Sequence, residues 1–286
     1  MRQLHPKQRA RIFHDLMEGM SVRAASRTNE VAFNTVLKFT VDMGKACEAY
    51  LYEKFQNLSI EVIQADEVWT HCGCKQERLR DDHPKGWGTV FTWTSIDPVS
   101  RLMPVWHCGG REYSDAYNFI QKLRWAIKDQ GKNLTIVTDG NRTYLPAIQE
   151  IFGHKVNYLH YYKHFYDEVV PEYRRYSMAR MKSSSRKVMI GEPDTTLTTN
   201  HIEATNMMVR TQSRRFVRMT NGHSKKLLNH RYAFAMTMFF YNFCRVHSAI
   251  RCTPAMEAGL IDHIISPLEA VMTLSPYATT DKRSAA

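Results

Sequence analysis

Leu58-Ser-Ile-Glu-Val-Ile-Gln-Ala-Asp66 marks the point where the pattern of apolar residues changes from helical to extended. Its apolar residues lead into Asp66 and predict a strand. Residues 88–96 alternate between apolar and polar side chains, as a second strand does. Residues 134–138 form a short apolar run that ends at Asp139. The first predicted strands of the chain therefore begin at this point.

Further elements follow these strands in a regular order. Strands are predicted at 101–106 and 156–159, and helices with one apolar face at 114–127 and 144–152. Beyond them lie a basic polar stretch, 174–199, and a long helix from about His201 to Arg215. The order strand-strand-strand-helix-strand-helix-strand predicts an α/β fold with a mixed sheet flanked by helices.

The N-terminal segment is predicted to be purely helical. One helix begins at Pro6, a second is capped by Ser21, and a third continues to Phe55. Three short helices with a tight second turn are typical of a helix-turn-helix, although a plain three-helix packing unit shows the same periodicity. The side chains expected to lie toward DNA are Arg23, Arg27, Asn34, Thr35 and Lys38. We expect a DNA-binding domain over 1–57 and a catalytic domain over 58–286.

Net charge indicates the class of partner. The 286 residues include 39 Lys and Arg against 28 Asp and Glu, which gives a net charge of +11. Residues 171–231 hold 13 of the basic and four of the acidic side chains. Such clustering favours a polyanion, although a solvated basic surface is the alternative. No apolar run is long enough to span a bilayer and the N-terminus is basic, so a cytoplasmic, nucleoid-associated protein without membrane contact is expected.

Asp66 and Asp139 are unusual because strands disfavour Asp and a buried, unpaired carboxylate is costly. Bound Mg²⁺ would compensate, although each Asp could instead cap the next helix. Glu203 is the third candidate ligand, and it shares one helical face with Asn206 and Arg210. Glu67 should point to the opposite side of its strand from Asp66. Paired acids of this kind can hold two metal ions for phosphoryl transfer.

Four strings carry a resemblance to a known family. They are Ile63-Gln-Ala-Asp66-Glu-Val-Trp69, Val137-Thr-Asp139-Gly140, His201-Ile-Glu203-Ala-Thr-Asn206 and Arg214-Arg-Phe-Val-Arg-Met-Thr-Asn-Gly-His-Ser-Lys-Lys226. Together they resemble the DDE transposases of bacterial insertion sequences, most nearly the insertion-sequence-one type. The resemblance implies a ribonuclease-H-like core and a DNA transposase that binds terminal inverted repeats. It implies cleavage and strand transfer into target DNA with Mg²⁺, which Mn²⁺ could replace.

The resemblance also assigns residues. It makes Asp66, Asp139 and Glu203 the catalytic acids and metal ligands, and it suggests a homodimer or a higher homo-oligomer. The cations expected to follow DNA phosphates in the basic region are Lys182, Arg186, Lys187, Arg210, Arg214, Arg215, Arg218, Lys225 and Lys226.

The chain departs from the family pattern at three positions. It has Glu30 where a turn glycine is expected, Phe33 in place of a basic residue, and His223 in place of an aromatic one. Two other functions stay open at this point. One is a ribonuclease-H-like nuclease without strand transfer, and the other is a non-catalytic DNA-binding regulator.

Overall fold

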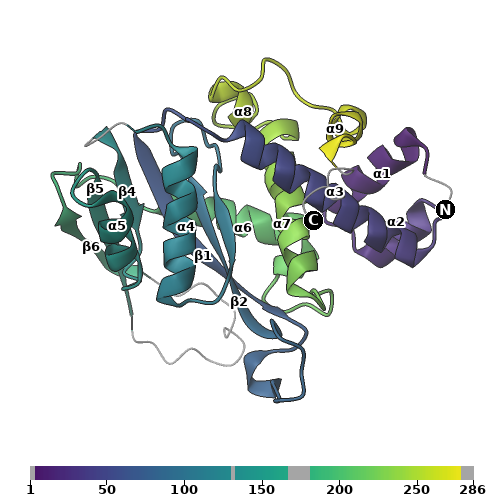
Figure 1. Ribbon diagram of the computed structural model, residues 1–286, viewed down its shortest axis with the longest axis horizontal. Helices are drawn as coiled ribbons and strands as arrows, with labels where there is room; N and C mark the ends of the chain where they lie inside the picture. Colours follow the sequence, from purple (N-terminus) through teal and green to yellow (C-terminus); the bar gives the residue numbers. More distant parts are fainter. Residues whose placement is uncertain (1–3, 130–132, 167–180, 278–286) are drawn as a thin grey trace, which may run out of the picture.

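A mixed β-sheet forms the larger half of the molecule (Figure 1). In the computed structural model, which describes residues 4–129, 133–166 and 181–277, its strand order is β3-β2-β1-β4-β5-β6. The strands are β1 (Val62–Cys72), β2 (Gly88–Ile96), β3 (Trp106–Gly109), β4 (Thr135–Thr138), β5 (Asn157–Phe165) and β6 (Met181–Ile190). β1, β2 and β3 pair antiparallel, β1, β4 and β5 pair parallel, and β6 is antiparallel to β5. The sheet thus joins an antiparallel half, β3-β2-β1, to a parallel half, β1-β4-β5.

Helices cover both faces of this sheet. α4 (Tyr113–Ala126) and α5 (Tyr144–Phe152) lie side by side on one face, and α6 (Asn200–Gln212) packs on β1 and β2 from the other (Figure 1). α4 buries apolar residues at three-to-four spacing, as a helix with one core-facing stripe does. These are Ala116, Phe119, Ile120 and Leu123. The α/β fold with a mixed sheet flanked by helices is therefore confirmed.

The N-terminal segment forms α1 (Pro6–Met17), α2 (Val22–Thr28) and α3 (Phe33–Lys54). Ser21 caps α2, because its Oγ accepts a hydrogen bond from the Ala24 amide at 3.1 Å. Glu30, in the turn before α3, has a φ of 53°, which is the left-handed conformation that glycine adopts without strain. The expected helices and turn are present, and their binding to DNA stays a prediction.

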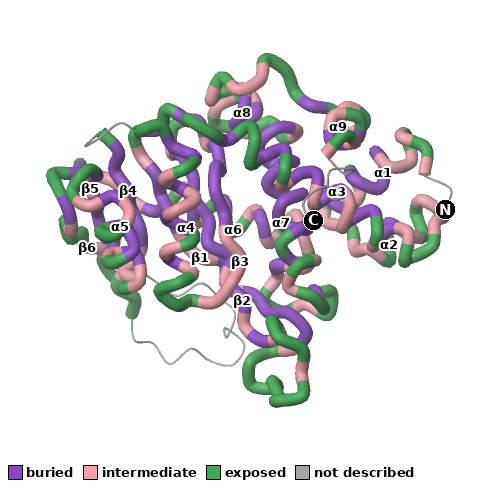
Figure 2. The backbone as a smooth tube through the Cα atoms, viewed as in Figure 1, coloured by how far each residue is buried: buried purple, intermediate pink, exposed green. Residues whose placement is uncertain are grey.

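The N-terminal helices share their core with the C-terminal ones. α3 packs along α7 (Leu227–Phe239), and α1 packs on α9 (Pro267–Leu274); a short α8 (Pro254–Glu257) lies between α7 and α9 in the chain. Gly44 permits the close approach of α3, since a Cβ there would lie 2.5 Å from the Tyr232 carbonyl oxygen. Buried residues run without interruption from these helices into the sheet (Figure 2). The predicted domain boundary at residues 57 and 58 falls between α3 and β1.

Several element boundaries differ from the sequence-based expectation, and β5 continues to Phe165 where the predicted strand ended at residue 159. β1 continues past Asp66 to Cys72, because its second half pairs fully with β2. The third strand begins at Trp106 and not at residue 101, since Asp97 and Arg101 close a turn. β6 lies inside the basic polar stretch 174–199, for which no strand was predicted, and residues 167–180 lie outside the described part.

The last difference concerns the helix expected over 201–215. α6 ends at Gln212, where Ser213 adopts an extended conformation, and a single 3₁₀ turn follows over Arg214–Phe216. The turn buries Phe216 against Phe234 of α7, with ring centroids 5.3 Å apart. Burial of this ring accounts for the break in the helix.

Candidate active site

Asp66 and Asp139 occupy neighbouring positions on adjacent strands. Parallel pairing of β1 with β4 ends at Ala65 and Thr138, so each Asp is the next residue of its chain. Asp66 Oδ2 accepts a hydrogen bond from Asn206 Nδ2 of α6 at 3.0 Å. Asn206 Oδ1 in turn accepts from Thr94 of β2 at 2.9 Å, which fixes the orientation of the amide. The two acids are therefore brought together by the sheet itself.

Glu67 belongs to the same cluster. Asp66, Glu67 and Asp139 each offer one carboxylate oxygen, and these oxygens lie within 4.8 Å of one another. As expected from the alternation of side chains along β1, Asp66 and Glu67 bond to different neighbours. Asn206 holds Asp66, whereas Asn141 and Arg111 hold Glu67. The longer Glu67 side chain nevertheless reaches the same space, so the expectation that it points away was wrong for its carboxylate. This group could hold a divalent metal ion.

Two neighbours hold Glu67 in place. Its Oε1 accepts from Asn141 Nδ2 at 3.1 Å, and its Oε2 lies 3.1 Å from an Arg111 nitrogen. The Glu67 side chain is only 3% exposed. Arg111 also lies 3.8 Å from Asp139 Oδ2, and its guanidinium sits over the Phe91 ring. Asn141 lies in the loop after β4, where its backbone N–H donates a hydrogen bond to Asp139 Oδ1 at 3.0 Å.

Glu203 lies at the edge of this cluster. Its Oε2 forms an ion pair with Lys163 of β5, and its Oε1 accepts from Thr199 Oγ1 at 2.6 Å. Its charge raises the pKa of both Asp66 and Asp139, so the carboxylate is within electrostatic reach of both. In the part of the chain that the structure describes, Glu203 is not among the acids whose oxygens converge.

Burial and mutual repulsion raise the free energy of the folded protein when all carboxylates of the cluster are charged. Burial, followed by the charge of Asp139, raises the pKa of Asp66 to about 6. Burial and the charges of Asp139 and Asp66 raise the pKa of Glu67 to about 7. Burial also raises the pKa of Asp139. Carboxylates that repel one another in this way are stabilised by a bound cation.

The predicted phosphate contacts divide into exposed and buried groups. Arg214, Arg218, Lys225 and Lys226 are exposed after α6, as are Lys182, Arg186 and Lys187 on β6. Arg215 differs, because its guanidinium donates to Ser224 Oγ at 3.1 Å and burial lowers its pKa. Arg210 is partly buried, and its Nε has no hydrogen-bond partner. His223, which stands where an aromatic residue was expected, places its ring 4.6 Å from the His71 ring, measured between centroids.

The predicted DNA-facing residues of the N-terminal helices all lie at the surface. Arg23, Arg27, Asn34 and Lys38 are exposed, and Thr35 is partly so. The Arg23 guanidinium sits 5.0 Å from the centroid of the Phe33 ring. Phe33, which replaces the expected basic residue, therefore holds a neighbouring cation at the start of α3.

Sequence reasoning missed Arg111, Asn141 and Lys163. Asn141 follows Asp139 by two residues, and its place after a strand-ending Asp-Gly was a usable signal. Arg111 and Lys163 carry no such signal, since each reaches the acids only through the pairing of distant strands.

No protein-family model matches the chain, and no curated protein does. Among solved structures, the chain is similar to the piggyBac transposase synaptic complex with hairpin DNA, with a TM-score of 0.43 and 10% identity over 99% of this chain and 74% of that one. It is also similar to a pre-cleavage Mos1 transpososome (TM-score 0.22, 9% identity, 55% of this chain and 60% of that one). A third is the Mos1 mariner paired-end complex with Mn (TM-score 0.21, 10% identity, 55% of this chain and 59% of that one). The chain thus spans less than two thirds of these Mos1 chains.

None of the helices in the described segments combines the length and the apolar character needed to cross a membrane.

Proposed function

We propose that the chain is a DNA transposase that binds the terminal inverted repeats of its element and catalyses metal-dependent strand cleavage and strand transfer. One observation carries the proposal. Asp66 and Asp139 lie side by side where the parallel pairing of β1 and β4 ends, with further acids beside them. Phosphoryl transfer at a pair of metal ions needs such a set of carboxylates.

The donor set fits Mg²⁺, with Mn²⁺ as a substitute. All donors are carboxylate oxygens, which are the ligands that hard divalent cations prefer. The raised pKa values of Asp66 and Glu67 reflect a local excess of negative charge that such a cation would offset. When bound, the metal would lower the pKa of an attacking water or 3′-hydroxyl and stabilise the leaving oxygen.

Asp66, Asp139 and Glu203 are proposed as the ligands. Glu67 already uses both oxygens, one for Asn141 and one for Arg111, so it is better suited to holding the loop and the arginine in position. Glu203 also uses both oxygens, for Lys163 and Thr199, but its side chain is 39% exposed against 3% for Glu67, and it stands on the helix whose Asn206 holds Asp66. Release of Lys163 would free Glu203 to complete the set.

The chain's own cations would bind the substrate. Arg111 and Lys163 neutralise Glu67 and Glu203 in the protein alone, and a phosphodiester entering the site offers each an alternative anion. The exposed cations that follow α6 would hold the flanking phosphates, and Asn34 at the start of α3 would read base edges. Two element ends must be joined, so the proposal includes a homodimer or a higher oligomer.

The test uses labelled duplexes that carry the inverted repeats found beside the gene. The wild-type protein should nick these ends and join them to target DNA only with Mg²⁺ or Mn²⁺, and Asp139→Asn should bind the ends but do neither. Nicked products without joined ones would indicate the nuclease. End binding without any metal-dependent nicking would indicate the regulator and refute the proposal.

A further inference from the structure

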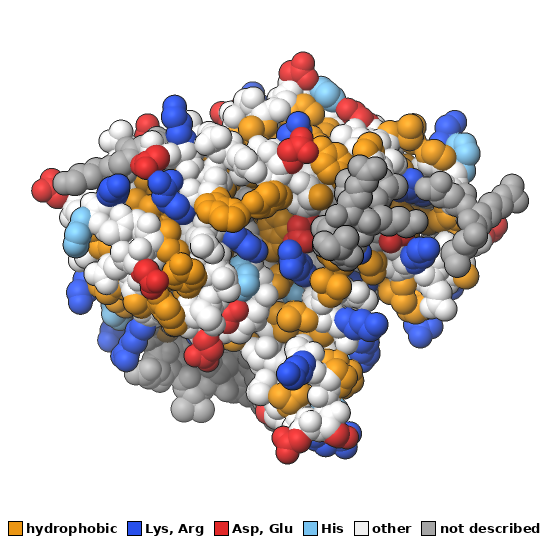
Figure 3. All heavy atoms as spheres, viewed as in Figure 1, with side chains coloured by type: hydrophobic (Ala, Val, Ile, Leu, Met, Phe, Trp, Pro, Cys, Tyr) orange, Lys and Arg blue, Asp and Glu red, His pale blue; other side chains and the backbone are white. Residues whose placement is uncertain are grey.

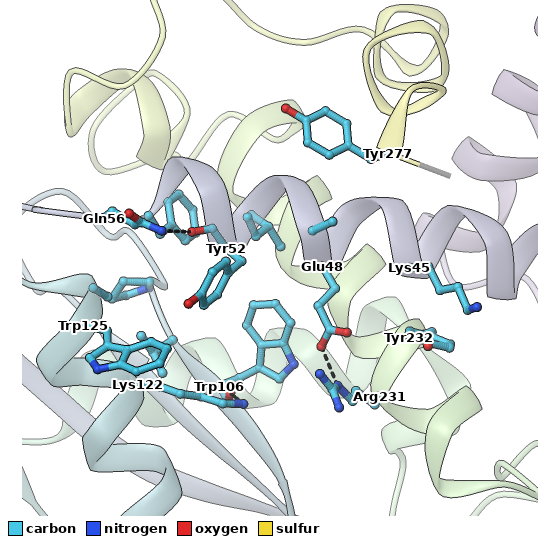
Figure 4. A pocket seen from close by; sticks show the side chains of 16 residues that line it. Lys45, Glu48, Tyr52, Gln56, Trp106, Lys122, Trp125, Arg231, Tyr232 and Tyr277 are labelled. Carbon is cyan, nitrogen blue, oxygen red and sulfur yellow. Dashed lines mark hydrogen bonds and ion pairs between the residues drawn. The ribbon is translucent and has the colours of Figure 1, made fainter. Parts of the chain in front are cut away.

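A large groove in the described residues lies away from the acidic cluster. It encloses about 890 Å³ between α3, α4 and α7 and reaches the start of β3 (Figure 4). None of Asp66, Glu67, Asp139 and Glu203 lines it. In the space-filling view, hydrophobic side chains meet Lys and Arg side chains in the hollowed surface between α4 and α7 (Figure 3). The volume suits a ligand the size of a nucleotide or larger.

Aromatic rings line the groove on several sides. Tyr52 of α3 and Trp125 of α4 pack edge to face at its mouth, with ring centroids 6.3 Å apart and an interplanar angle of 66° (Figure 4). Both are large and strongly exposed, at 58% and 61%. Trp106 lies deeper and is almost fully buried, and Tyr232 lies on the α7 side. Exposed aromatic faces at the mouth of a groove are platforms on which a planar ring can stack.

Cations from three helices converge on the same groove. They are Lys45 of α3, Lys122 of α4 and Arg231 of α7, and the one carboxylate among the lining residues, Glu48, already pairs with Arg231 at 2.5 Å. Lys122 donates to the Trp106 carbonyl oxygen at 3.2 Å, which leaves two further N–H donors on its ammonium. Burial and the nearby Arg231 lower the pKa of Lys122. An anion placed between Lys122 and Arg231 would relieve this repulsion.

We propose that this groove binds an unpaired nucleotide of a DNA strand, with its base stacked on the exposed ring of Trp125 beside Tyr52 and its phosphate held by Lys122 and Arg231. The inference rests on the proposed function, because DNA processing exposes single-stranded ends. Aromatic platforms combined with a cationic groove are the general means by which proteins hold single strands without reading sequence. A neutral protein segment would be a poorer fit, since the lining residues carry three cations and one carboxylate and so have a net positive charge.

The experiment measures binding of the full-length protein to a short 5′-phosphorylated oligothymidine of about six nucleotides, without metal. Trp125→Ala should weaken this binding about tenfold, since stacking on one aromatic ring contributes about 1–3 kcal/mol per base. Trp125→Phe should retain most of the affinity. Lys122→Met, which keeps the aliphatic stem, should weaken binding to the phosphorylated strand more than to the same strand without its phosphate.

Two controls match these variants. Tyr113→Ala removes an exposed aromatic from the same helix outside the groove, and Lys155→Met removes an exposed cation elsewhere. Neither should change strand binding. Affinity for a blunt duplex should stay within about twofold of wild type in all variants, because duplex phosphates are assigned to other cations.

Unchanged strand affinity in both Trp125→Ala and Lys122→Met would overturn the proposal. A change of oligomeric state in Trp125→Ala with unchanged strand affinity would also overturn it and identify the groove as a protein interface. The experiments can refute the transposase proposal and the groove proposal independently of each other. A wild-type protein that never nicks DNA but loses strand binding in these variants would refute the transposase and leave the groove assignment standing.

Discussion

The acids of the cluster and the predicted DNA-facing cations of the N-terminal helices differ in whether other side chains hold them in place. Each acid at the sheet is held by bonds from distant segments, as when Asn206 holds Asp66 and Arg111 holds Glu67. Within the described residues, by contrast, Arg27 and Lys38 at the helical end form no side-chain hydrogen bond or ion pair. Groups that are fixed in advance suit chemistry, whereas groups left to solvent suit a partner. The two regions should therefore respond differently to substitution.

The largest expected effect is at Glu203. Glu203→Gln removes one charge with little change in size, and we expect Mg²⁺-dependent nicking to fall at least about 100-fold, since a single preorganised electrostatic contact typically contributes 10² to 10³ in rate. End binding in a gel-shift assay should persist. Glu67→Gln should lose less activity, because its oxygens hold Asn141 and Arg111. Glu61→Gln, at an exposed position beside β1, is the matched control.

A reversed order, with Glu67→Gln inactive and Glu203→Gln near wild type, would make Glu67 the third ligand. The contrast between the acidic cluster and the N-terminal helices would still hold, with Glu67 in place of Glu203 as the third ligand.

The second effect concerns pH and stability in the metal-free protein. The pKa of Glu67 rises from its usual 4.5 to about 7 on folding, so charging it destabilises the folded state. The destabilisation is absent below about pH 4.5 and complete above about pH 7. Glu67→Gln should therefore gain stability relative to wild type across this window. The gain should reach up to about 3 kcal/mol, because one pKa unit corresponds to about 1.4 kcal/mol.

Unfolding midpoints with EDTA at several pH values measure this difference. Comparison with wild type at each pH removes the opposing effect of buried His230, whose pKa burial lowers to about 3. If the stability difference between Glu67→Gln and wild type does not vary with pH, ionisation of Glu67 does not destabilise the folded protein.

The third effect concerns the N-terminal surface. Asn34→Ala should reduce the preference for the selected DNA sequence over random DNA about tenfold, since a good base contact contributes about 1–3 kcal/mol. Lys38→Ala should weaken binding to both DNAs equally and lower the salt slope by about 1. Competition binding at two salt concentrations measures both. Equal losses of sequence preference in the two variants would argue against base reading by Asn34.

The smallest effect is at the turn before α3. Glu30 has a φ of 53°, so Glu30→Gly should stabilise the protein by about 1 kcal/mol by relieving left-handed strain. Glu18→Gly is the control, because Glu18 has an ordinary φ of −84° and should gain nothing. Chemical denaturation measures both. A loss of stability in Glu30→Gly would mean that the Glu30 side chain contributes more than its backbone costs.

Prediction from sequence succeeded where local rules decide the structure. Pro6 and a periodic apolar face predicted α1, and residues 144–152 were predicted as α5 at the observed ends. It failed where distant segments decide. The extension of β1 to Cys72 depends on pairing with β2, and the position of the Glu67 carboxylate depends on the loop after Asp139. Lys163 meets Glu203 only because β5 and α6 pack on the same sheet.

The length of α3 has a consequence for where a strand would be cut. Its 22 residues form one uninterrupted helix, which corresponds to about 33 Å at 1.5 Å per residue. Asn34 is near one end, and the other end is joined to β1 by residues 55–61. Because α3 is unbroken and packs along α7, the bases that are read and the bond that is cut would stay at a nearly constant separation. On the proposed function, the cut would therefore fall a fixed number of base pairs from the recognition sequence.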